Sequence, residues 1–80
     1  MADDAAQTIL ELERLGDAEY DAMYEDAPHW VKTRHENAHR YFSKAVAAAE
    51  QAGLMDEVLR LSARRNHIDA VYNHQFRWMR

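Results

Sequence analysis

The stretch Pro28–Gly53, PHWVKTRHENAHRYFSKAVAAAEQAG, decides the fold of this 80-residue chain. A proline near the start suits the first turn of a helix, and a glycine at the end suits a helix stop. Between them small or apolar residues recur at intervals of seven, as Val31, Ala38 and Ala45 do. This spacing predicts one long amphipathic helix, and its alanines allow another helix to approach closely.

A second long helix is expected over residues 55–79, directly after the glycine. Its apolar stripe consists of Leu54, Val58, Leu61, Ile68, Tyr72, Phe76 and Met79. Because the connection between the two long helices is very short, they should pair antiparallel as a hairpin.

The N-terminal part of the chain is expected to form two short helices, over residues 3–15 and 18–26. Gly16 should end the first, since glycine adopts the left-handed conformation easily, and Asp17 should cap the second. The sequence therefore predicts an all-α helical bundle in a single domain, residues 1–80. Its architecture is a long antiparallel helical hairpin plus one or two short N-terminal helices.

The composition supports a helical protein and excludes several other classes. Hydrophobic residues make up 48% of the chain, too many for plain disorder, and two glycines and one proline leave few interruptions. The absence of cysteine excludes disulfides and thiolate metal sites. The acidic start, MADDAAQ, is unlike a secretory signal, and no apolar run is long enough for a bilayer. We therefore expect a cytoplasmic protein.

The length of the two predicted helices also bears on assembly. A helix of 25 residues spans about 37 Å, and two short N-terminal helices would cover only part of the exposed apolar stripe. A large uncovered apolar surface is unusual on a soluble monomer. We therefore expect either a homodimer or a bound partner protein.

The net charge of the chain is −4, but acidic and basic residues are distributed unevenly along the sequence. Residues 1–27 carry nine acids against Arg14, whereas residues 60–80 carry five arginines against Asp69. Two interpretations stay open: the ends attract each other, within one chain or across a dimer, or they form separate faces for separate partners. An arginine face would allow nucleic-acid binding through Arg60, Arg64, Arg65 and Arg77, although the acidic balance of the whole chain argues against it.

Aromatic residues gather at two places in the sequence that an antiparallel hairpin brings to one end. The candidate binding residues there are Tyr20, Tyr24, Trp30, Phe76, Arg77 and Trp78. Tyrosine, tryptophan and arginine are the residue types enriched at interaction hot spots. The same aromatics would also serve as a core plug for that end, and this alternative stays open.

The segment His35-Glu36-Asn37-Ala38-His39 matches the pattern H-E-x-x-H. Two histidines one helical turn apart can chelate zinc, and the glutamate can act as general base on a metal-bound water. The segment resembles the zincin metalloprotease signature, which implies a zinc hydrolase. A third ligand has no recognisable spacing, but His67 on the second long helix would complete a bundle site with His35, His39 and a carboxylate.

Taken together, these features favour a small non-enzymatic protein-binding module: a regulator, inhibitor or adaptor. It would act through the aromatic and arginine patch and through an acidic N-terminal face. The alternatives are a metal-binding helical bundle or minimal zinc hydrolase, and a nucleic-acid binder that uses the C-terminal arginines.

Overall fold

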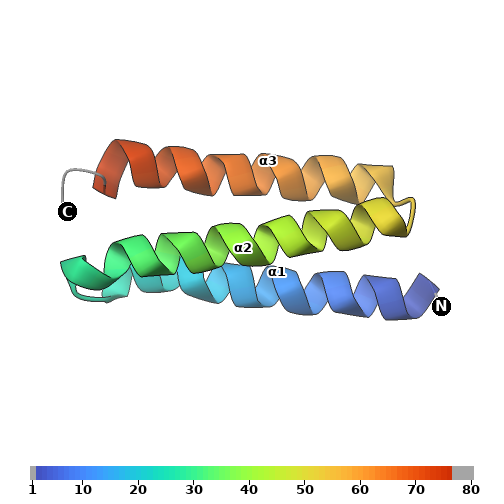
Figure 1. Cartoon of the computed structure of the whole chain (residues 1–80), viewed down its shortest axis with the longest axis horizontal. Coiled ribbons are helices and arrows are strands. Elements are labelled where there is room, and N and C mark those ends of the chain that lie inside the picture. Colours follow the sequence, from blue (N-terminus) through green and yellow to red (C-terminus); the bar gives the residue numbers. More distant parts are fainter. Residues whose placement is uncertain (1, 77–80) are drawn as a thin grey trace.

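The computed structural model describes residues 2–76, which form three α-helices and no strand. Helix α1 spans Ala2–Glu25, α2 spans Val31–Gln51 and α3 spans Met55–Val71. A short 3₁₀ turn, η1 (Pro28–Trp30), precedes α2, and a π-helical turn, η2 (Tyr72–Phe76), follows α3. Each helix runs opposite to the one before it, so α1 and α3 point the same way (Figure 1). The result is an elongated helical bundle, 42 × 17 × 12 Å.

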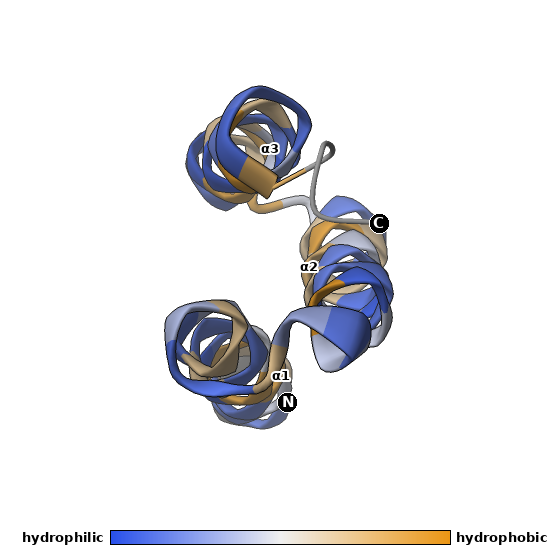
Figure 2. Cartoon of the chain, turned by 90° about the vertical axis from the view of Figure 1, so that its left-hand side faces the viewer, coloured by the Kyte–Doolittle hydropathy of each residue, from blue (hydrophilic) through white to orange (hydrophobic). Residues whose placement is uncertain are grey.

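Helix α2 is the common element of the bundle, because both α1 and α3 pack along it. The end-on view in Figure 2 places α2 at the corner of the arrangement, with α1 and α3 on either side. Arginine side chains of α3 reach across to acids of α1, as described below. None of the helices within residues 2–76 combines the length and apolar character needed to cross a lipid bilayer.

The prediction of one or two short N-terminal helices is wrong, because a single helix, α1, runs from Ala2 to Glu25. Gly16 lies inside this helix and is buried. A β-carbon built on Gly16 would lie 2.6 Å from the Phe42 ring of α2. The glycine therefore serves close helix packing rather than chain reversal, and Asp17 pairs with Arg64 of α3 instead of capping a new helix.

The helix stop expected at Gly53 is confirmed. Gly53 has φ 71°, the left-handed conformation that only glycine adopts without strain. The Leu54 amide donates to the Ala49 carbonyl at 2.9 Å, and the Gly53 amide donates to the Glu50 carbonyl at 3.1 Å. This paired arrangement is a Schellman motif, and it satisfies carbonyls that the end of α2 would leave free.

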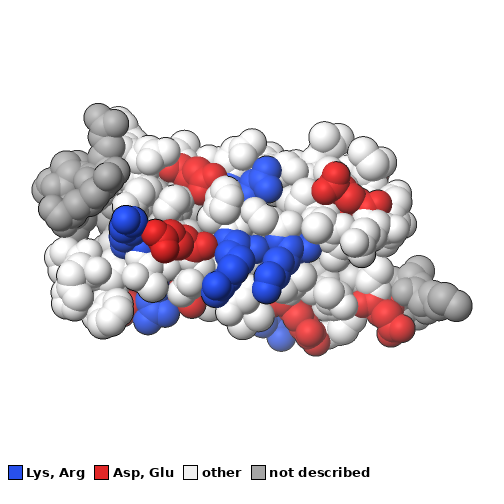
Figure 3. All heavy atoms as spheres, in the orientation of Figure 1, with Lys and Arg blue, Asp and Glu red and all other residues white. Residues whose placement is uncertain are grey.

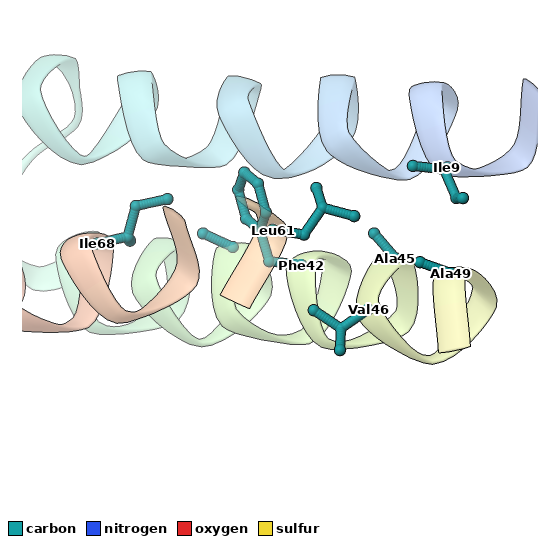
Figure 4. Packing of buried hydrophobic residues seen from close by; sticks show 8 residues of the cluster. Ile9, Phe42, Ala45, Val46, Ala49, Leu61 and Ile68 are labelled. Carbon is teal, nitrogen blue, oxygen red and sulfur yellow. The ribbon is translucent and has the colours of Figure 1, made fainter. Parts of the chain in front are cut away.

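Buried side chains form two clusters along the bundle. Phe42 lies at the centre of the larger one, where its ring points from α2 toward α1 (Figure 4). The remaining buried members are Ile9, Ala38, Ala45, Val46, Ala49, Leu61 and Ile68. The smaller cluster comprises Met23, Val31, Tyr72 and Phe76, at the end where α1 meets η1. The core therefore extends into the aromatic end of the molecule.

Helix α3 is shorter than the predicted helix over residues 55–79. Regular α-helix ends at Val71, and the π-helical turn η2 carries the chain to Phe76. Tyr72 and Phe76 nevertheless remain on the buried side. The last part of the predicted helix, with Arg77 and Trp78, lies outside the described residues.

Candidate functional site

The aromatic end of the bundle contains both buried and exposed rings. Phe76 is only 9% exposed, whereas Tyr24 is 54% exposed. The ring of Tyr24 meets Phe76 edge to face at a centroid distance of 5.2 Å, and meets Tyr20 in the same way at 5.6 Å. Tyr24 thus covers the core with one side and presents the other to solvent.

Trp30 lies in the η1 turn between α1 and α2, at the same end of the bundle (Figure 1). It is 52% exposed, and its aromatic neighbour is the exposed ring of His29 at 5.1 Å. No residue of η1 is buried. The indole is therefore placed on the surface by a turn rather than fixed in the core. Arg77 and Trp78, the other predicted members of this patch, lie outside the described residues.

The hydroxyl groups of Tyr20 and Tyr24 lie 3.4 Å apart and share a hydrogen bond. This bond, together with partial burial, raises the pKa of Tyr20 to about 12. The Arg64 guanidinium sits 5.6 Å from the Tyr20 ring centroid. Tyr20 is thus tied to both neighbours, and it is a supporting rather than a freely exposed member of the patch.

Two ion pairs join α1 to α3. The Arg60 guanidinium donates to both Glu13 oxygens at 2.6 and 2.9 Å, and Arg64 donates to Asp17 at 2.8 Å. Hydrogen bonding to Arg60 lowers the pKa of Glu13, although burial opposes the effect. The acidic and arginine-rich ends of the sequence therefore attract each other within one chain.

The predicted acidic N-terminal face also contains acids that are held in ion pairs within the chain. Arg34 of α2 binds Glu19 at 2.9 Å and Asp26 at 2.6 Å, which joins α1 to α2. Among the acids of α1 whose side chains the structure describes, Asp4, Glu11, Asp21 and Glu25 are exposed and form no ion pair with α2 or α3. Asp21 and Glu25 flank Tyr24 in sequence.

The arginines proposed for nucleic-acid binding are largely engaged inside the molecule. Arg60 and Arg64 bind acids of α1, and Arg65 lies 3.3 Å from the Ser43 hydroxyl. On the face shown in Figure 3, lysines and arginines gather near the middle and acids lie on both sides of them. This face therefore shows no continuous basic stripe of the kind typical of nucleic-acid-binding proteins.

The histidines of the H-E-x-x-H segment meet a residue that sequence reasoning missed, Asp69 of α3. His35 Nε2 lies 2.8 Å from Asp69 Oδ1, and His39 Nδ1 lies 3.0 Å from Asp69 Oδ2. The His35 ring also stacks on Tyr72 with a centroid distance of 4.0 Å and an interplanar angle of 1°. One carboxylate therefore links two turns of α2 to α3.

The expected third ligand, His67, is exposed and does not join this cluster. A shallow cavity of about 480 Å³ beside the cluster is lined by His35, Glu36, His39, Asp69 and Asn73. Among residues 2–76, no three histidine, aspartate or glutamate side chains are arranged to hold a metal ion. The short nitrogen–oxygen distances instead describe a hydrogen-bonded clasp between helices.

A groove between α1 and α3 is a further feature that the sequence did not indicate. It has a volume of about 310 Å³ and is lined on its apolar side by Ala6, Ile9, Leu10 and Leu54. Glu13, Glu57 and Arg60 close its polar end. Leu10 is 47% exposed and Leu54 is 37% exposed, so part of the apolar lining is open to solvent.

Comparison with known proteins provides no relative, since no family model, curated protein or solved structure matches the chain. The function must therefore be inferred from the geometry described above.

Proposed function

We propose that this chain is a small non-enzymatic protein-binding module that acts as a regulator, inhibitor or adaptor. The observation that carries the proposal is the exposure of Tyr24 and Trp30 at one end of the bundle, at 54% and 52%. Large aromatic side chains that a fold leaves exposed are the residues most enriched at interaction hot spots.

The packing behind Tyr24 suits it for this role. Its ring is braced by Phe76 and its hydroxyl is hydrogen bonded to Tyr20, so little side-chain freedom remains to be lost on binding. The exposed acids Asp21 and Glu25 lie beside it. The complementary partner surface is an apolar pocket bordered by lysine or arginine. Arg77 and Trp78 stay predicted members of the binding site on the basis of the sequence.

The homodimer and the cytoplasmic location are also part of this proposal. Support for a dimer comes from exposed apolar side chains away from the aromatic end, namely Leu10, Leu54 and Met55.

The metal-binding alternative would use His35 and His39, which converge on Asp69. As they stand, these described side chains are not arranged to hold a metal ion. Elemental analysis of protein purified without a histidine tag tests it. Stoichiometric zinc, iron or manganese that is lost in Asp69→Asn would favour this alternative over a purely structural clasp.

The protein-binding proposal is tested with a Trp30→Ala variant. A partner captured from host lysate is purified and its dissociation constant is then measured with wild-type and variant protein. We expect Trp30→Ala to weaken binding by a factor of about 30, the loss typical of a hot-spot residue. Leu59→Ala, which also truncates an exposed apolar side chain, is the matched control and should bind like wild type. Equal binding by Trp30→Ala would contradict the proposed surface.

A further inference from the structure

The sides of α1 and α3 that face each other carry matched side chains at successive levels; we call this surface the α1/α3 edge. At the first level, Leu10 of α1 and Leu54 before α3 line one groove. At the second level, Glu13 binds Arg60 with two hydrogen bonds. Asp17 and Arg64 form the third level. The α1 side is thus apolar and then acidic. The α3 side is apolar and then mainly basic, since Glu57 lies beside Arg60 in the groove and binds it.

The α1/α3 edge is incompletely covered. The side chains of Arg60 and Arg64 are 48% and 40% exposed, although Arg60 already binds both Glu13 and Glu57 and Arg64 binds Asp17. The groove at the first level has buried Ile9 in its lining, but it leaves Leu10 and Leu54 partly open. Both the apolar and the charged levels therefore retain capacity for a further partner.

We propose that a second copy of this chain docks on the α1/α3 edge, related by a two-fold axis parallel to the helices. The inference rests on the homodimer of the proposed function and specifies its interface. Such an axis keeps every level at its own height and exchanges α1 with α3. Glu13 of one copy then faces Arg60 of the other. Leu10 of one copy enters the groove end of the other copy, where Leu54 lies within about one helical turn of it in height.

The match follows from the rotation itself, because a two-fold axis parallel to the helices leaves the height of every residue unchanged. Glu13 and Arg60, which pair within one copy, therefore also lie at the same height between the two copies. The alternative two-fold axis, perpendicular to the helices, brings α1 against α1. In that arrangement Glu13 and Asp17 of one copy face the same two acids of the other copy, and the arginines of one copy face those of the other. Both contacts bring like charges together and are repulsive. Charge complementarity therefore selects the parallel axis.

The oligomeric state of the full chain is the first test, measured by sedimentation equilibrium over a range of protein concentrations. Wild-type protein should be dimeric, and Leu10→Lys should raise the dimer dissociation constant at least about tenfold, because the change occurs twice in each interface. Leu59→Lys is the matched control. Leu59 is 67% exposed on the same bundle but does not line the groove, so its dimer should be unchanged. Thermal unfolding of each variant monitors the fold.

Disulfide trapping then tests the symmetry, since the natural chain has no cysteine. Leu10→Cys and Leu54→Cys are made as separate proteins, so no bond can form within one chain. Oxidation of the mixture should give the mixed dimer, one copy of each variant, in several-fold excess over either same-variant dimer. A predominant Leu10→Cys homodimer would instead support the perpendicular axis and overturn the proposed arrangement.

The outcomes separate the interface from the broader proposal. A dimer that survives Leu10→Lys and gives no mixed disulfide overturns the α1/α3 edge but leaves a homodimer through another surface. A wild-type monomer at all concentrations overturns both the interface and the homodimer. In either case, partner binding through Trp30 is measured independently and stands or falls by its own test.

Discussion

Gly16 of α1 and Phe42 of α2 lie so close that a β-carbon on Gly16 would sit 2.6 Å from the phenylalanine ring. Glycine inside a helix costs about 1 kcal/mol relative to alanine. The fold accepts this cost, because the absent side chain is what allows α1 to pass directly over the largest fully buried side chain of the core. The contact also explains why α1 continues through a residue that locally favours a helix end.

Gly16→Ala should therefore destabilise the protein, although alanine is the better helix former. Overpacking a core costs about 1–3 kcal/mol, which exceeds the propensity gain of about 1 kcal/mol. We expect a net loss of about 1–2 kcal/mol in urea unfolding. The double variant Gly16→Ala, Phe42→Leu should lose less than the sum of the two single changes, because the smaller side chain leaves room for the methyl group. An increase in stability for Gly16→Ala alone would contradict the close contact.

Glu13→Gln should weaken the link between α1 and α3 in a pH-dependent way. Arg60 lowers the pKa of Glu13 in the folded state from its usual 4.5, so the stabilisation is present above that pH and is lost as the pH falls through the folded value. Because Arg60 is half exposed, we expect a difference of only about 0.5–1 kcal/mol at neutral pH. Denaturant unfolding of both proteins at neutral and acidic pH should show this difference shrink in acid. A difference that is constant with pH would exclude the ion pair as its source.

Tyr20 should ionise at a higher pH than a free tyrosine. Its folded pKa of about 12 exceeds the usual 10.0, so its contribution to stability is complete below pH 10 and is lost as the pH rises through about 12. Ultraviolet titration of tyrosinate should show a late component that disappears in Tyr20→Phe. In Tyr24→Phe the component should shift to lower pH, because the phenylalanine cannot share the hydrogen bond. An unchanged titration in Tyr24→Phe would contradict the hydroxyl contact.

Asp69→Asn should loosen the clasp between α2 and α3. The carboxylate accepts hydrogen bonds from His35 and His39, and an amide oxygen replaces it only in part. We expect a loss of about 1–2 kcal/mol in the free energy of unfolding. His67→Asn, two residues away and exposed, is the control and should remain within about 0.5 kcal/mol of wild type. If both substitutions changed the free energy of unfolding equally, the hydrogen bonds from His35 and His39 to Asp69 would make no contribution to stability.

Periodicity predicted those parts of the fold that depend on local sequence. The helix that follows Pro28 and the stop at Gly53 were both expected, because their signals, a seven-residue apolar spacing and a left-handed glycine, act within one element. Gly16 was misinterpreted for the opposite reason. Its role depends on Phe42, which lies far along the chain and makes contact only after the helices pack.

The candidate site shows the same division. Residue types indicated the aromatic end, but exposure separates Tyr24 and Trp30 from the buried Phe76, and exposure follows from packing. The partner of the two histidines was missed because an error of two residues in helix register exchanges His67 for Asp69. The groove beside Leu10 lies between helices that are far apart in sequence, so no local sequence pattern predicts it.

The central position of α2 also has a consequence for how the chain reaches its fold. Each helix packs mainly on the neighbour that directly precedes or follows it in the sequence, across short connections. Chains dominated by such local contacts fold on the order of microseconds to milliseconds. The chain should therefore spend little time with its apolar stripes exposed during synthesis. Substitutions in α2, which affect both packing surfaces at once, should alter the rate of folding more than comparable changes in the outer faces of α1 or α3.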